Sequence, residues 1–176
     1  MKRVLLMGIL FVCLLIVLVG CQEKKNKPLT ILVFSSVLPT EEARLKADIN
    51  SVFENGSHVD LQLYPFTMEK WAAELSSRNG DIYVANEETI TQMLNKKGLT
   101  PLDSVYEGKE LPNSTKSYQV TNQESGEVHL YAVPIRKNFY PKNAGRTNSK
   151  LLAILPEFSG NKENAFRVLK YLADEN

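Results

Sequence analysis

The sequence predicts an α/β domain with a mainly parallel sheet and helices on both faces, arranged in three layers. Short apolar runs alternate with amphipathic stretches three times between residues 29 and 98, which is the pattern of strand–helix units in a parallel sheet. The first run, residues 29–34, is apolar and β-branched at successive positions, as expected for a strand buried on both faces. Asn-Gly pairs at residues 55–56 and 79–80 end the amphipathic stretches, in keeping with helix ends.

The first half of the chain contains three predicted strands, and each is followed by a predicted helix. Helix starts are indicated by capping side chains, and the second strand is indicated by its alternating apolar residues. The third helix is expected to extend to Leu94, with Gly98 beyond its end. In chain order, the strands and helix starts are residues 29–34, Thr40, residues 59–63, Thr67, residues 81–85 and Asn86.

The second half of the chain gives a weaker pattern. Residues 117–121 and 127–135 are expected to pair as two strands. Pro134 would then lie at a strand end or a sheet edge, because proline has no N–H for the ladder. The remaining segments are a polar loop at 138–150, a buried strand at 151–155 and a final helix capped by Asn161.

The amino-terminal residues read as a targeting segment. Lys2 and Arg3 precede an almost unbroken apolar run at residues 4–19, which is short for a membrane span and typical of a secretory signal. Residues 18–21 read LVGC and resemble the lipobox of bacterial lipoproteins. That resemblance implies that residues 1–20 are removed and that Cys21 carries a diacylglyceryl thioether. The alternative is an uncleaved single-span anchor.

Under either alternative, the rest of the chain lies on the extracytoplasmic face of the cell membrane. Residues 21–28 (CQEKKNKP) would form a short polar tether after the lipid. Two acyl chains anchor a protein stably where one does not. The sequence therefore predicts a palmitate-type lipoprotein whose first partner is the membrane.

Composition argues against several classes of function. The 176 residues are 43% apolar and 23% charged, and 21 basic residues balance 20 acidic ones, so no nucleic-acid partner is expected. Cys13 and Cys21 are the only cysteines, and His58 and His129 are the only histidines, without metal-ligand spacing. The sequence contains no GxSxG, GxGxxG or P-loop motif. We expect no enzyme activity, no metal and no cofactor.

Several segments, in order, resemble the extracellular solute-binding proteins of ABC importers, especially the carbohydrate-directed group. Each piece is short, and the likeness depends on their order along the chain. The segments are LTILVF at 29–34, HVDLQLYP at 58–65, GDIYV at 80–84, GLTPLD at 98–103, YAVP at 131–134 and the stretch 159–172.

The resemblance implies one lobe of a periplasmic-binding-protein type II fold, because the short stretch between Pro134 and Leu151 replaces a whole second lobe. Residues 29–176 would then form a single domain accessory to carbohydrate ABC uptake. It would bind an oligosaccharide weakly, or dock on the permease or on a full-length solute-binding protein. The alternative is a lipoprotein that binds only proteins. A cell-wall hydrolase would need converging carboxylates, which the sequence does not display.

Candidate binding residues follow from the rule that ligands of open α/β sheets lie beyond the carboxyl ends of the strands. Each candidate also has a structural explanation: turn formation for the serines, helix capping for Thr67 and Asn86, and core packing for Trp71. Arg136 would meet an acidic sugar or simply face solvent. The candidates are Ser35, Ser36, Phe66, Thr67, Trp71, Asn86, Glu87, Tyr131 and Arg136.

Overall fold

The computed structural model of the chain describes residues 27–35, 41–53, 58–94, 97–122, 125–136 and 150–173. The predicted signal segment, Cys21, Ser36 and the predicted helix start at Thr40 lie outside the described residues. The strands are β1 (Leu29–Phe34), β2 (Val59–Tyr64), β3 (Ile82–Asn86), β4 (Gln119–Thr121), β5 (Val128–Leu130), β6 (Val133–Pro134) and β7 (Leu151–Ile154). The α-helices are α2 (Glu42–Asn50), α3 (Met68–Ser77), α4 (Glu87–Thr91) and α5 (Lys162–Leu172), and two 3-10 helices are η2 (Asp103–Tyr106) and η3 (Asn113–Tyr118).

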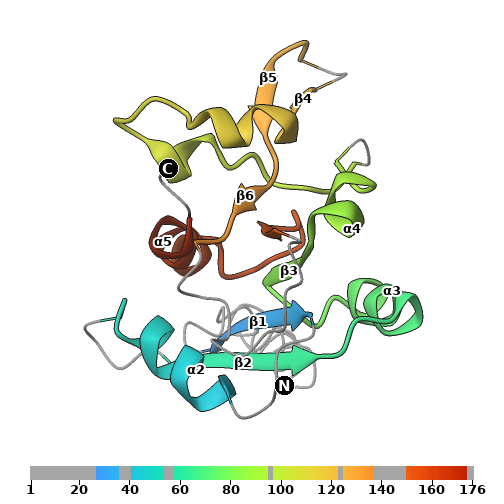
Figure 1. Cartoon of the computed structure of the whole chain (residues 1–176), viewed down its shortest axis with the longest axis vertical. Helices are drawn as coiled ribbons and strands as arrows, with labels where there is room; N and C mark the ends of the chain where they lie inside the picture. Colours follow the sequence, from blue (N-terminus) through green and yellow to red (C-terminus); the bar gives the residue numbers. More distant parts are fainter. Residues whose placement is uncertain are drawn as a thin grey trace, which may run out of the picture.

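The main sheet has five strands in the order β2-β1-β3-β7-β6. β1 pairs in parallel with both β2 and β3, whereas β7 runs antiparallel to β3 and to β6. Four of the five strands therefore point the same way, and β7 is the one reversed strand. The predicted α/β class with a mainly parallel sheet is confirmed, as a mixed sheet (Figure 1).

Helices cover the sheet around β1, whose six residues are all buried. Because successive side chains of a strand point to opposite faces, both faces of the sheet are covered there. On one face the Trp71 ring of α3 packs edge-on against Phe34 of β1, with 5.0 Å between ring centroids. α2 lies alongside β2 and buries Leu45 and Ile49 completely. The apolar residues at helical spacing thus form the core side of each helix.

The prediction of one continuous strand at 127–135 is wrong. The structure divides this segment between β5, which pairs only with β4 in a separate two-stranded sheet, and β6 in the main sheet. Just after β5 the Tyr131 N–H donates to the carbonyl of Tyr118 at 3.2 Å, which continues the β4–β5 register by one residue before the chain passes to β6. Pro134 lies in the edge strand β6, as its missing N–H predicts. Figure 1 shows the β4–β5 hairpin at the opposite end of the long axis from β1 and β2.

Two helix predictions also need correction. α4 ends at Thr91, and the turn that follows is closed by the Met93 N–H donating to the carbonyl of Ile90, so Leu94 is buried from a turn. Asn161 makes no side-chain cap for α5. Its side-chain amide instead donates to the backbone carbonyl of Lys27 at 3.1 Å. This bond fastens the chain just before β1 to the start of α5.

A buried carboxylate joins the amino-terminal ends of β1 and β3. Asp81 accepts hydrogen bonds from the backbone N–H of Thr30 at 3.0 Å and from the hydroxyl of Ser159 at 2.9 Å. These bonds satisfy a group that would be costly to bury alone. No helix in the described part of the chain combines the length and the apolarity needed to cross a bilayer.

Candidate functional site

The carboxyl ends of β1, β2 and β3 meet at one edge of the sheet, as the sequence predicts. Phe34 lies opposite Tyr64 in the parallel ladder, and the Ser35 N–H continues it by donating to the Tyr64 carbonyl at 3.0 Å. Ser35 is therefore placed at this edge, half-buried. Phe66, which follows β2, packs half-buried against the core.

Two of the predicted binding residues serve as helix caps. The Thr67 hydroxyl accepts a hydrogen bond from the Lys70 N–H at 3.2 Å, and the Asn86 side-chain oxygen accepts one from the Thr89 N–H at 2.8 Å. Both caps satisfy donors that the first turn of a helix leaves unpaired. The contacts thus match the alternative expectation for both residues, which was helix capping.

Trp71 lies in the core. Its side chain is only 4% exposed. The ring packs edge-on between those of Phe34 and Tyr83, at centroid distances of 5.0 and 5.8 Å. A sugar cannot stack on this ring while the packing is intact, so the structure favours the packing role over the binding role.

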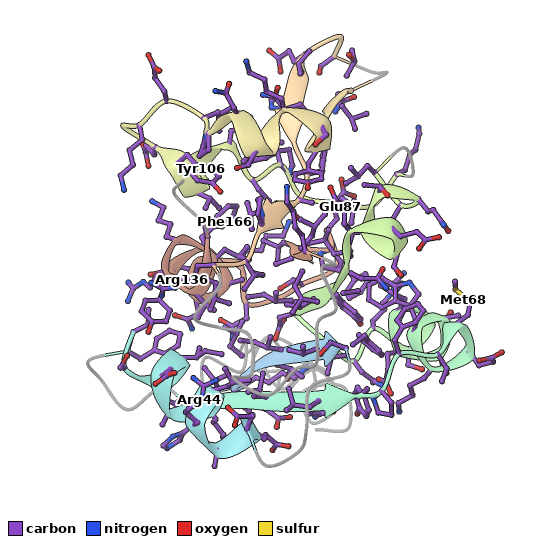
Figure 2. All side chains as sticks on the ribbon, in the orientation of Figure 1. Arg44, Met68, Glu87, Tyr106, Arg136 and Phe166 are labelled. Atoms are coloured by element: carbon purple, nitrogen blue, oxygen red, sulfur yellow. The ribbon has the colours of Figure 1, made fainter. Side chains whose placement is uncertain are left out.

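The other candidates do not converge on these residues. Glu87 accepts a hydrogen bond from the buried hydroxyl of Tyr118, which links α4 to η3. Tyr131 is nearly buried beside His129. The Arg136 guanidinium stacks on the Tyr171 ring of α5 at 3.8 Å. Figure 2 shows Glu87 and Arg136 well separated, on different sides of the fold in that view.

A charged cluster lies over α3 near the same edge. Lys70 pairs with Glu74 and sits 4.3 Å from the centre of the Tyr64 ring. The hydrogen bond from Lys70, helped by one from Asn79, lowers the pKa of the Glu74 carboxyl. The bond to Glu74 likewise raises the pKa of the Lys70 ammonium. Burial raises the pKa of the neighbouring Tyr83 hydroxyl, which donates to the Glu74 carbonyl.

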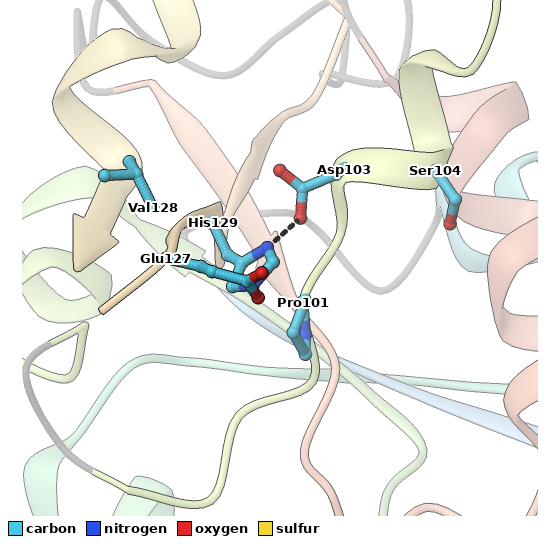
Figure 3. A pocket seen from close by; sticks show the side chains of 6 residues that line it. All are labelled: Pro101, Asp103, Ser104, Glu127, Val128 and His129. Atoms are coloured by element: carbon cyan, nitrogen blue, oxygen red, sulfur yellow. Dashed lines mark hydrogen bonds and ion pairs between the residues drawn. The ribbon is translucent and has the colours of Figure 1, made fainter. Parts of the chain in front are cut away.

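A shallow pocket of about 580 Å³ lies elsewhere, between η2 and the β4–β5 hairpin (Figure 3). Its chemistry centres on His129, whose two ring nitrogens lie 3.1 Å from Asp103 Oδ2 and 3.3 Å from Glu127 Oε2. The second oxygen of Asp103 accepts from the Leu130 N–H at 3.2 Å. The lining residues are Pro101, Asp103, Ser104, Glu127, Val128 and His129.

The sequence did not single out this pocket, although its parts were visible. Asp103 ends the GLTPLD segment, and Glu127 and His129 are two residues apart in a predicted strand, which places them on one face. The contact between η2 and the hairpin could not be predicted from the sequence, because a long stretch of chain separates the two elements. In the described ranges, no three His, Cys, Asp or Glu side chains are grouped so as to hold a metal ion.

This geometry defines an α/β domain with a mixed sheet and a separate polar pocket. No protein-family model matches the chain. It is distantly homologous to the Bacillus subtilis (strain 168) protein described as “Putative lipoprotein YteS”, with 22% identity over 159 residues. The match spans 89% of each chain, so the two proteins are of similar length.

A partial structural likeness is found to a solved protein described as a “putative oligosaccharide periplasmic-binding protein from Synechococcus sp. MITs9220 in complex with zinc”. The TM-score is 0.38 and the sequence identity is 18%, over 61% of this chain and 27% of that chain. The present chain thus spans little more than a quarter of the length of that protein.

Proposed function

We propose that the chain is a lipid-anchored protein of the extracytoplasmic membrane face, whose single solute-binding-like lobe assists carbohydrate uptake by an ABC importer. It acts as a weak, open binder of saccharides or by docking on the transporter components. The observation that carries the proposal is the LVGC signal joined to one α/β sheet in which β6 and β7 are neighbours. The residues between those two strands are too few for a second lobe.

The homologue described as a lipoprotein supports the anchor, because the match covers most of both chains. The order of the sequence segments supports the solute-binding likeness. Full receptors bury their ligand between two lobes that close on it. A single lobe offers about half of those contacts and no closure, so weak and rapidly reversible binding is the expected mode.

The anchor is tested by metabolic labelling with a fatty-acid analogue in the native bacterial membrane. Wild type should be labelled, and Cys21→Ala should lose the label. Cys13→Ala is the matched control, because it removes the other cysteine of the sequence and should leave labelling unchanged. Persistent labelling of Cys21→Ala would refute the lipid attachment.

Ligand binding is tested by thermal unfolding of the purified lipoprotein in detergent with a panel of neutral and acidic oligosaccharides. A ligand that binds the folded form raises the melting temperature. At least one saccharide should do so at millimolar concentration. A panel without any shift would reject the binding mode.

The second candidate is a lipoprotein that binds only other proteins. It is favoured by the capping roles of Thr67 and Asn86 and by the burial of Trp71, which commit these side chains to the fold. In that case the importer permease or its full-length receptor should cross-link to the protein in the membrane. The cross-link should survive Ser35→Ala, Ser36→Ala and Asn86→Ala, and it should form equally well with and without saccharide, whereas a ligand-dependent complex should require the saccharide.

A further inference from the structure

We propose that the pocket formed by Asp103, Glu127 and His129 binds a neutral oligosaccharide, whose hydroxyl groups donate hydrogen bonds to the two carboxylates. This inference rests on the proposed function and gives it a location. The pocket lies between η2 and the β4–β5 hairpin and away from the strand ends at which the sequence placed the ligand (Figures 1 and 3).

The first argument is the balance of donors and acceptors. His129 has a carboxylate beside each of its ring nitrogens, so the imidazole is already engaged within the cluster. The hydrogen bonds that a ligand can add are made by the carboxylate oxygens, which accept them from hydroxyl groups.

The second argument is the remaining acceptor capacity. An ionised carboxylate has about four acceptor positions. Within the described residues, Asp103 uses two of them, on the Leu130 N–H and on His129, and Glu127 uses one on His129. The Glu127 side chain is also 70% exposed. The pocket therefore presents acceptors to a ligand rich in donors, which is a property of polyols.

The third argument is that the pocket wall is held in place before any ligand arrives. His129 lies on β5, opposite Val120 of β4. The Leu102 N–H donates to the Leu130 carbonyl at 2.6 Å, which fixes the start of η2 against the hairpin. The Tyr131 ring meets the His129 ring edge-on at 6.3 Å. A site built on paired elements loses little entropy on binding.

The fourth argument is charge. Among the six residues that line the pocket, two are carboxylates and none is a lysine or an arginine. A uronic acid would bring a third carboxylate to this place, and like charges repel at short range. Pro101 and Val128 are exposed and supply apolar surface for the carbon-bound hydrogens of a sugar ring. The expected class is therefore neutral, not acidic.

The test uses the two histidines as reporters. His129 lies in the pocket, and His58 is exposed just before β2, so its imidazole signals serve as an internal reference. Maltotriose, cellotriose and xylotriose are titrated into the purified lipoprotein and followed by NMR of the imidazole carbons and protons. At least one should shift the His129 signals and leave those of His58 in place. Trigalacturonic acid at equal concentration should leave both unchanged.

Two variants sharpen the test. Glu127→Gln removes one charged acceptor and should weaken saccharide binding by about tenfold. Glu69→Gln is the matched control, because Glu69 is an exposed glutamate on α3, at the other end of the fold (Figure 1), and it should bind like wild type. Equal weakening by both variants, or no weakening by Glu127→Gln, would overturn the assignment.

The outcomes separate this inference from the function on which it rests. A saccharide that raises the melting temperature and changes the fluorescence of Trp71, but leaves His129 unshifted, would place the ligand at the strand ends and refute the pocket. A panel that changes neither the melting temperature nor any reporter would refute the binding function itself. Shifts from trigalacturonic acid as large as those from the neutral sugars would refute the neutral class.

Discussion

At the carboxyl edge of the sheet, polar side chains form hydrogen bonds with backbone N–H groups. Beside the β4–β5 hairpin, other polar side chains bond to one another around a pocket that is open to solvent. Thr67 and Asn86 cap helices and Trp71 is enclosed by aromatic rings. Asp103, Glu127 and His129 are bonded mainly to each other and keep part of their surface exposed. Side chains that were expected to bind a ligand thus hold the fold in one region, and ionisable side chains remain partly exposed in the other.

The largest effect is expected when the Trp71 ring is removed from the carboxyl edge of the sheet. Trp71→Ala should lower the free energy of unfolding by about 3–5 kcal/mol, because it leaves a cavity against Phe34 and Tyr83. Urea unfolding followed by circular dichroism measures the loss. Met68→Ala, on the same helix but 54% exposed, should change stability by less than about 0.5 kcal/mol. A Trp71→Ala protein as stable as wild type would mean that this ring is not structural.

A methyl group added at Gly80, just before β3, probes the packing of Tyr83 from the amino-terminal side of that strand. A Cβ at this position would lie 2.8 Å from Leu32 Cγ and 3.1 Å from a Tyr83 ring carbon. Both of those side chains are fully buried, so Gly80→Ala should cost about 1–3 kcal/mol through overpacking.

Thermal and urea unfolding measure the cost of Gly80→Ala. Gly160→Ala is the control, because nothing lies within 4 Å of its added Cβ. Equal stability of the two alanine variants would contradict the close packing of β1 on β3.

The Glu74 carboxylate makes the stability of the first region depend on pH. Its pKa is lowered in the folded protein by Lys70 and Asn79, so the folded state binds the proton less well than the unfolded state does. The resulting stabilisation is present above the unfolded pKa of about 4.3 and is lost as the pH falls through the folded pKa. Wild type should therefore lose more stability than Glu74→Gln as acid is added below about pH 5.

Urea midpoints measured across the acid range give the slope for each protein. Glu163→Gln, which alters an exposed pair with Arg167, should keep the slope of wild type. Parallel curves for wild type and Glu74→Gln would show that the cluster over α3 does not couple to folding.

The smallest effect is expected in the pocket. Glu127→Gln should change the free energy of unfolding by less than about 0.5 kcal/mol, since its side chain is mostly exposed and caps no helix. The same urea measurement applies. If Glu127→Gln lowered the free energy of unfolding by several kcal/mol, Glu127 would have a structural role, and the contrast between the two regions would not hold.

The parts of the fold that local pattern controls were accessible from sequence. The apolar run at 29–34, the caps at Thr67 and Asn86 and the missing N–H of Pro134 each specify a local conformation that the structure confirms. The sheet edge that these elements create was predictable for the same reason. The residue types alone could not decide whether a capping oxygen or an aromatic ring at that edge would remain accessible.

What escaped prediction depends on contacts between distant segments. The division of residues 127–135 between two sheets follows from the different partners of its two halves, because β5 pairs with β4 and β6 pairs with β7. The N–H of Leu102, at the start of η2, also bonds to the Leu130 carbonyl. The pocket exists only because Asp103 and His129, 26 positions apart, are brought together by that contact. Asn161 was expected as a cap because asparagine favours that role, but its amide bonds to Lys27 instead.

That last bond bears on the membrane anchor proposed for Cys21, because it holds Lys27 against the start of α5. Lys27 lies six positions after Cys21, so a lipid on Cys21 would be at most roughly 20 Å away along the chain. The amino-terminal ends of β1, β2 and β3 would then face the headgroups, and because β1 and β2 lie across the long axis of the fold, the β4–β5 hairpin would lie to the side of the anchor (Figure 1). A tether of this length would limit how far the domain could rise from the membrane surface.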